Sequence, residues 1–166
     1  NWDPVGLAAV SDEEVIHRDT VSKFYHLRYF ISDGQGNPTD KYIIIATPRP
    51  QTIMADAAVC INPEDERYHW LKGKKIVIPL INKEIPIIED SYVEMGFGTG
   101  CLKVTPAHDV NDYEIGIRHN LPVLDIIDDH GRLNEKAQIL VGEDRFEARK
   151  KIEVMLQEAG NLEKVE

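Results

Sequence analysis

Residues 96–116 read GFGTGCLKVTPAHDVNDYEIG, and this stretch decides which fold the rest of the chain builds. Its alternating glycines lead into Cys101–Thr105, a short run that predicts a β-strand ended by Pro106. Asp109–Asn120 then predicts a helix that begins at an aspartate cap. Polar side chains gather where the strand meets the helix: Lys103, Thr105, His108, Asp109 and Asp112. Binding sites are often built at such junctions.

The composition indicates one globular domain over residues 1–166, with 42% hydrophobic residues to form its core. The net charge of −10 argues against a broadly basic nucleic-acid clamp and leaves room for a local contact with a nucleic-acid end. Cys60 and Cys101 are too few for a disulfide framework, so we expect buried thiols of a cytoplasmic protein. The sequence has neither a recognisable signal peptide nor an apolar run of membrane-spanning length. Because it opens on Asn1 and not on methionine, we expect a domain excised from a longer protein.

Apolar and β-branched runs outside this stretch predict many short strands. The expected strands are Glu14–Thr20, Lys23–Ile31, Tyr42–Thr47, Ala57–Ile61, Lys75–Leu80, Glu84–Ile88 and Pro122–Ile127. The side chains of Lys23–Ile31 alternate between apolar and polar, which predicts one buried face. The continuous apolar run Tyr42–Thr47 predicts a strand that is buried on both faces.

Helical signals are fewer than strand signals. Thr52 is expected to cap a short helical turn, and Asn62 is expected to cap a helix over Pro63–Leu71. Asp144–Ala159 has the strongest helical pattern, with a capping box at its start and Gly160 beyond its end.

The order of these elements predicts the fold class. Residues 1–12 are expected to form an extended N-terminal arm, and residues 143–166 a C-terminal helix and tail. Strands and helices do not alternate regularly, which disfavours a doubly wound parallel sheet. We therefore predict a mainly β fold with α: a mixed closed or nearly closed β-barrel with flanking helices.

The residues of the central junction also allow a metal site and purely structural roles. His108, Asp109, Asp112 and His119 raise a metal-site hypothesis, which is disfavoured because His119 lies a helix length from His108. Helix capping alone also explains Asp109 and Asp112, with Lys103 in a surface ion pair with either of them. The alternating glycines fit a tight turn with positive φ, or a close approach of a ligand to the backbone.

Two motifs resemble a known family. Ala46–Thr52, ATPRPQT, resembles the threonine-rich motif ATTRPET of the inserted editing (CP1) domain of class I aminoacyl-tRNA synthetases. Gly98–Gly116 resembles the second motif of that domain, and Lys103 with the TPAHD and NDYE runs is similar to its valyl branch. The likeness covers essentially the whole chain. The synthetic motifs HIGH and KMSKS are absent, so the resemblance implies an editing domain without the aminoacylation site.

The resemblance implies a reaction and a set of site residues. The reaction is post-transfer editing, the hydrolysis of the ester of mischarged threonyl-tRNA(Val). Threonine and valine are nearly isosteric, so a hydrophobic synthetic pocket rejects threonine poorly, and this pair is the standard illustration of double-sieve editing. The implied catalytic residues are Asp112, Thr47, Arg49 and Thr52. The implied substrate-binding residues are Phe97, Lys103, Thr105, Asp109, Asp112 and Asp56.

Within that set, the resemblance assigns individual roles. Asp112 would hold the α-ammonium of the substrate, Phe97 would form part of the pocket wall, and polar groups at Lys103 and Asp109 would read the threonine hydroxyl. A water oriented by the ribose hydroxyl would attack the ester. No cofactor or metal is implied, because ATP serves only the absent synthetic domain. The implied partners are the 3′ end of valine tRNA, the misacylated threonine and the catalytic domain of the parent synthetase. We expect a monomer with no membrane contact.

The first motif departs from the family pattern at two positions. Pro48 stands where relatives usually carry a second threonine, and Gln51 stands where they carry glutamate. Proline supplies neither a hydroxyl nor a backbone N–H, and it holds Thr47 extended. A module that binds the tRNA end without hydrolysing it is therefore an alternative, beside the metal-dependent hydrolase.

Overall fold

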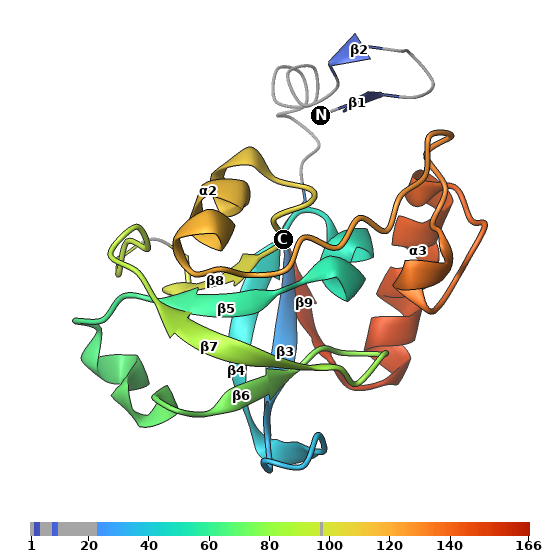
Figure 1. Cartoon of the computed structure of the whole chain (residues 1–166). Coiled ribbons are helices and arrows are strands. Elements are labelled where there is room, and N and C mark those ends of the chain that lie inside the picture. The colour runs from blue at the N-terminus through green and yellow to red at the C-terminus, as the bar shows by residue number, and fades with distance from the viewer. Residues whose placement is uncertain (1, 4–7, 10–22, 97) are drawn as a thin grey trace.

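The computed structural model describes residues 2–3, 8–9, 23–96 and 98–166 (Figure 1). In the expected N-terminal arm, β1 (Trp2–Asp3) pairs antiparallel with β2 (Ala8–Ala9). The predicted strand Glu14–Thr20 and the predicted pocket residue Phe97 lie outside the described residues. No helix in the described part of the chain has both the length and the apolar character to cross a membrane.

One curled sheet forms the body of the protein (Figure 1). Its strands are β3 (Tyr25–Ser32), β4 (Pro38–Thr47), β5 (Ala58–Ile61), β6 (Lys75–Val77), β7 (Glu84–Glu89), β8 (Cys101–Val104) and β9 (Leu162–Val165). They run in the order β4-β3-β6-β7-β5-β8, and the C-terminal strand β9 pairs with β3. The β5–β7 pair is parallel and the other pairs are antiparallel.

The sheet is a curled half-barrel and does not close fully. Strands β4 and β8, at the two ends of the strand order, contact each other. No hydrogen-bonded ladder joins them within residues 23–96 and 98–166. The prediction of a mainly β fold with flanking helices is thus confirmed, while full closure of a barrel is not.

The two longest strands show why the sheet curls around a single core. Strand β3 alternates as predicted, and its inward side chains, among them Leu27 and Tyr29, are fully buried. The prediction that Tyr42–Thr47 is buried on both faces is wrong. Ile43 and Ile45 are buried, but Tyr42 is 42% exposed and the alternating residues are only half-buried. The reason is that β4 pairs antiparallel with β3 in a part of the sheet where one face packs on the core and the other is turned outward, as the same alternation in β3 shows.

Among the described residues, the helices are α2 (Val110–Arg118), α3 (Arg145–Glu158) and the short 3₁₀ helices η2 (Pro50–Ala55), η3 (Glu66–Leu71) and η4 (Glu135–Ala137). Figure 1 shows α2 next to β8 and α3 along the side of the sheet that carries β9. Both α-helices begin at the predicted aspartates, whose side chains accept two backbone N–H bonds each. Helix α3 buries Ala148, Ile152 and Leu156, which lie on one face of the helix.

Two predicted helix starts are wrong. Helix η2 begins at Pro50, before Thr52, whose hydroxyl donates to the carbonyl of Arg49 at 3.1 Å and caps nothing. Helix η3 begins at Glu66 and is capped by Asp65. The side chain of Asn62 accepts the amide of Glu64, which lies before this helix. No side chain caps the first turn of η2, whereas the side chain of Asp65 accepts the amide of Arg67 at the start of η3.

The predicted strand Pro122–Ile127 is also wrong. Only an isolated bridge from Ile127 to Leu133 forms there. The amide of Ile126 donates to the His108 imidazole at 3.3 Å, and the amide of Ile127 donates to the side chain of Asp125 at 3.1 Å. Side chains therefore satisfy backbone groups that a neighbouring strand would otherwise take.

Candidate functional site

The two motif segments meet in space although they are far apart in the sequence. Strand β4 ends at the buried Thr47, whose hydroxyl accepts the amide of Arg49 at 3.1 Å. The guanidinium of Arg49 then donates to the carbonyl oxygen of His108 at 2.5 Å. This bond joins the end of β4 to the turn between β8 and α2. Pro48, between Thr47 and Arg49 in the sequence, is exposed.

Lys103 lies at the centre of a buried polar cluster beneath this junction. Because side chains alternate along β8, Lys103 points toward the core on the same face as Cys101 and Thr105. Its ammonium lies 2.5 Å from Oδ1 of Asp56 and 2.6 Å from the Thr105 hydroxyl. The Thr52 hydroxyl is farther away, at 3.4 Å.

The prediction that Lys103 pairs at the surface with Asp109 or Asp112 is therefore wrong. Its partner is Asp56, at the end of η2, and the two side chains are 8% and 0% exposed. Asp56 was predicted to bind substrate, but its oxygens accept from Lys103, Tyr29 and Thr105. In this arrangement Asp56 is buried and accepts hydrogen bonds from the other members of the cluster.

Tyr29 completes the cluster and was missed by the sequence analysis. Its hydroxyl donates to Oδ2 of Asp56 at 2.6 Å from the inward face of β3. Burial raises the pKa of Tyr29 well above its ordinary value, so the phenol stays protonated and donates. Burial also raises the pKa of Asp56, and the charge of Lys103 opposes that rise. The one available signal was a tyrosine at an inward position of an alternating strand.

The N-terminus of α2 presents two carboxylates. Oδ1 of Asp109 accepts the amides of Asn111 and Asp112 at 2.9 and 3.2 Å. Oδ2 of Asp112 accepts the amide of Thr105 at 2.8 Å. Burial, with a smaller contribution from the charge of Asp109, raises the pKa of Asp112 to about 6. Within the described residues, Oδ2 of Asp109 and Oδ1 of Asp112 have no hydrogen-bond partner, so each can accept from a ligand.

His108 has a structural place in the same turn. Burial lowers the pKa of its imidazole to about 4, with smaller contributions from the charges of Arg49 and Lys103 and an opposing one from Asp125, so the ring is neutral at pH 7. Its Nε2 accepts the amide of Ile126. His119 lies at the other end of α2, where it contacts Asp90 at 2.9 Å. Across the described ranges, no three His, Cys, Asp or Glu side chains come together closely enough to hold a metal ion.

The structure thus gathers most of the predicted site residues around one junction. These are Thr47, Arg49, Thr52, Asp56, Lys103, Thr105, Asp109 and Asp112. Gln51, noted only as a departure from the motif, is buried and accepts from the guanidinium of Arg149 at 3.2 Å. That bond ties α3 to the first motif, and no local sequence pattern announces it.

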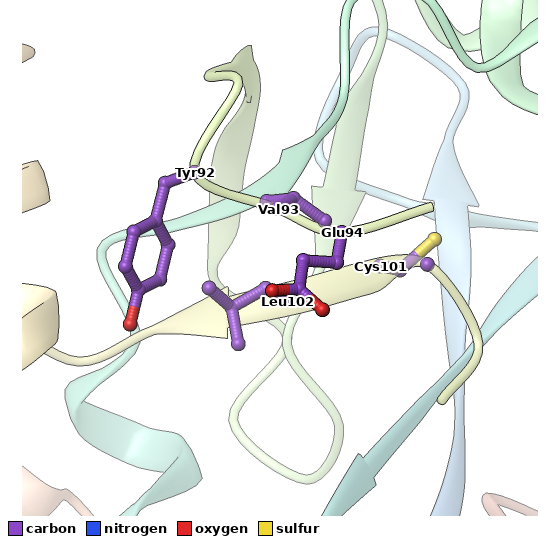
Figure 2. A pocket seen from close by; sticks show the side chains of 6 residues that line it. Tyr92, Val93, Glu94, Cys101 and Leu102 are labelled. Carbon is purple, nitrogen blue, oxygen red and sulfur yellow. The ribbon is translucent and has the colours of Figure 1, made fainter. Parts of the chain in front are cut away.

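A separate surface cavity of about 240 Å³ lies beside the glycine-rich loop (Figure 2). Its lining residues are Tyr92, Val93, Glu94, Gly100, Cys101 and Leu102, none of which belongs to the Lys103 cluster. Gly100 has a φ of 82°, and a Cβ there would lie 2.6 Å from the guanidinium of Arg67. Gly98 also has positive φ. At these two positions the tight-turn explanation of the glycines holds.

Comparison with known proteins agrees with the two motifs. The family model described as "Leucyl-tRNA synthetase, editing domain" matches residues 62–161. The valine–tRNA ligases of Porphyromonas gingivalis and Bacillus subtilis are 58% and 51% identical over the whole chain. The chain spans 18% of the length of each of these relatives.

Two solved structures share the fold. One is the ternary complex of Agrobacterium radiobacter K84 agnB2 LeuRS with tRNA and LeuAMS, with a TM-score of 0.64 and 18% identity over 94% of this chain and 22% of that one. The other is GlLeuRS-CP1, with a TM-score of 0.63 and 12% identity over 86% of this chain and 98% of that one. At these identities the likeness concerns the fold alone.

Proposed function

The chain belongs to the editing-domain (CP1) family of class I aminoacyl-tRNA synthetases, and on that premise we propose that it hydrolyses the ester bond of mischarged threonyl-tRNA(Val). The observation that carries the proposal is the bond from Arg49 to the carbonyl of His108. It brings the threonine-rich segment, suited to the ester and the terminal adenosine, against the carboxylates at the start of α2. The ester of a bound aminoacyl end would thus lie beside the first motif while its amino group lies beside the carboxylates of α2.

Asp112 is suited to hold the α-ammonium of the substrate. Its Oδ2 is fixed by the amide of Thr105, which leaves Oδ1 to accept from a ligand. With a pKa of about 6, the carboxylate is ionised at neutral pH and can form a charge-assisted hydrogen bond. The raised pKa reflects a partly desolvated group, which gains more from a cation than a fully hydrated one does.

The threonine hydroxyl would be read by polar groups of the same junction. Asp109 offers an oxygen that the helix cap leaves unused, and Lys103 donates to the Thr105 hydroxyl on the chain that leads into α2. A site built to hydrogen-bond a hydroxyl rejects an analogue that lacks it, because its buried polar groups are then left unpaired. Valine offers a methyl group in place of that hydroxyl, so its correct ester would be spared.

The proposed chemistry is attack of a positioned water on the ester, without a metal or cofactor. Thr47, Arg49 and Thr52 would surround the ester and the adenosine, and a ribose hydroxyl would orient the water. Positioning supplies most of the rate enhancement in such a reaction. The single-stranded 3′ end of the tRNA and the catalytic domain of a parent synthetase are the proposed partners of a monomeric, cytoplasmic domain. Because only a tRNA end enters, a net charge of −10 is compatible with this function.

The test is single-turnover deacylation of threonyl-tRNA(Val) and valyl-tRNA(Val) by this chain, with and without a strong chelator. We expect faster loss of the threonyl ester than of the valyl ester, and no effect of the chelator. Binding of the threonyl end without hydrolysis would favour the alternative of a binding module, for which Pro48 is the motivation. Loss of activity with chelator and recovery with zinc would favour the metal-dependent hydrolase.

A further inference from the structure

The three N–H donors of the Lys103 ammonium make contacts of unequal length. Two of them form short contacts, at 2.5 Å to Asp56 and at 2.6 Å to Thr105. The third points to the Thr52 hydroxyl at 3.4 Å, which is longer than the usual range for a hydrogen bond. The donor that faces Thr52 is therefore the one that a ligand can take over most easily.

Further hydrogen bonds to the Asp56 carboxylate hold the two short contacts in place. Oδ1 of Asp56 accepts from Lys103 and, at 3.2 Å, from the Thr105 hydroxyl. Oδ2 accepts from Tyr29 at 2.6 Å. All four of these side chains are buried, and burial removes the competing water that would let the ammonium turn.

The backbone of this carboxylate is also held in place. The amide of Asp56 donates to the carbonyl of Ile53 at 3.0 Å, and the amide of Ala57 donates to the carbonyl of Val104 at 2.8 Å. Asp56 is thus attached to the strand that carries Lys103. A buried ion pair contributes little to stability compared with well-packed apolar residues, so stability does not account for this construction.

We propose that Tyr29 and Asp56 are positioning residues for substrate selection: they hold Lys103 so that its third N–H passes from Thr52 to the hydroxyl of a threonyl substrate. The inference rests on the proposed editing function and deepens it. Thr52 keeps a partner when the donor leaves, because its hydroxyl donates to the carbonyl of Arg49 at 3.1 Å. With a valyl substrate the donor stays with Thr52, so valine gains no contact.

The test measures binding of non-hydrolysable threonyl- and valyl-adenosine analogues by calorimetry, for the chain as given and for Tyr29→Phe. Tyr29→Phe keeps the ring that packs in the core and removes only the hydroxyl. Loss of one hydrogen bond to the carboxylate should lower the preference for the threonyl analogue about threefold to tenfold. The affinity for the valyl analogue should not change. Asp56→Asn should lower the same ratio further.

A merely structural role would lower both affinities together or neither of them. The matched control is Asp90→Asn, which removes a carboxylate that accepts from Arg118 and His119 away from the cluster. Asp90→Asn should lower the melting temperature and leave the affinity ratio unchanged.

The outcomes separate this inference from the proposed function. If the unaltered chain prefers the threonyl analogue and folded Tyr29→Phe keeps the full preference, the positioning role is overturned and the editing proposal stands. If the unaltered chain binds both analogues equally, selection at this site fails, and the positioning role fails with it. Should Asp56→Asn not fold, Tyr29→Phe decides alone.

Discussion

Helices α2 and α3 begin with the same chemical pattern and have different surroundings. Each has an aspartate cap, Asp109 or Asp144, that accepts two backbone N–H bonds. Each has an acidic residue three positions later. In α2 that residue, Asp112, is 7% exposed and accepts the amide of Thr105. In α3 the corresponding Glu147 has a side chain that is 58% exposed and lies 3.6 Å from Lys150.

The difference shows that local sequence decides the helix cap, whereas the surroundings of the acidic residue three positions later depend on the tertiary structure. The partial positive charge of a helix N-terminus favours an acid at both places. Only α2 follows a strand of the sheet through a turn, so only its first turn lies against the buried cluster (Figure 1). Burial then raises the pKa of Asp112 to about 6, whereas the exposed Glu147 is not buried in this way.

The largest expected effect is on activity. Asp112→Ala should reduce hydrolysis of threonyl-tRNA roughly 10- to 100-fold, because a hydrogen bond to a charged group contributes about 1.5–3 kcal/mol. Glu147→Ala should leave the rate unchanged, since that side chain is exposed and pairs only with its own helix. Single-turnover deacylation by the two variants is the measurement. Equal rates for the two would remove Asp112 from the site.

The next effect concerns stability against pH. Because the folded-state pKa of Asp112 lies above its ordinary value of 3.8, its stabilising contribution is complete below that pH and is lost as the pH rises through about 6. Asp112→Asn mimics the neutral form, so it should be more stable than the unaltered chain above pH 6, by at most about 3 kcal/mol. The gain should vanish toward pH 4.

Denaturant unfolding at several pH values between 4 and 8 checks this sign. The matched variant is Glu147→Gln, for which the difference in stability should stay small and nearly flat across the same range, because the side chain is well exposed. A stability gain for Asp112→Asn that is independent of pH would contradict the assignment of the shift to this carboxylate.

The smallest effect sharpens the comparison of the caps themselves. Asp109→Ala and Asp144→Ala should each lower the free energy of unfolding by about 1 kcal/mol, because each removes the acceptor for two N–H groups. Only Asp109→Ala should also slow threonyl-tRNA hydrolysis, because it removes the proposed contact with the threonine hydroxyl and a backbone bond that positions Asp112. Thermal melts and deacylation rates of both variants test this. An equal loss of activity in the two would mean that stability alone governs the rate.

Among the candidate site residues, the sequence predicted which ones lie close together but not which side chains pair with each other. The resemblance grouped Thr47, Arg49 and Lys103 with the start of α2, and the structure brings those segments together. It missed Tyr29 and gave Asp56 a different place, because a partner in the core is chosen by packing across distant strands. The predicted strand over residues 122–127 is wrong for the same kind of reason, because the amide of Ile126 donates to the distant His108 imidazole.

By itself the sequence determined the features that depend on near neighbours. The alternation in β3, the strand and helix on either side of Pro106, and the aspartate caps all follow from steric and hydrogen-bonding preferences over a few residues. Tertiary structure alone decided that Lys103 is buried against Asp56 and that Asp112, unlike Glu147, is desolvated. Burial and charge pairing are set by which surfaces meet when the sheet curls, and local sequence patterns do not encode that meeting.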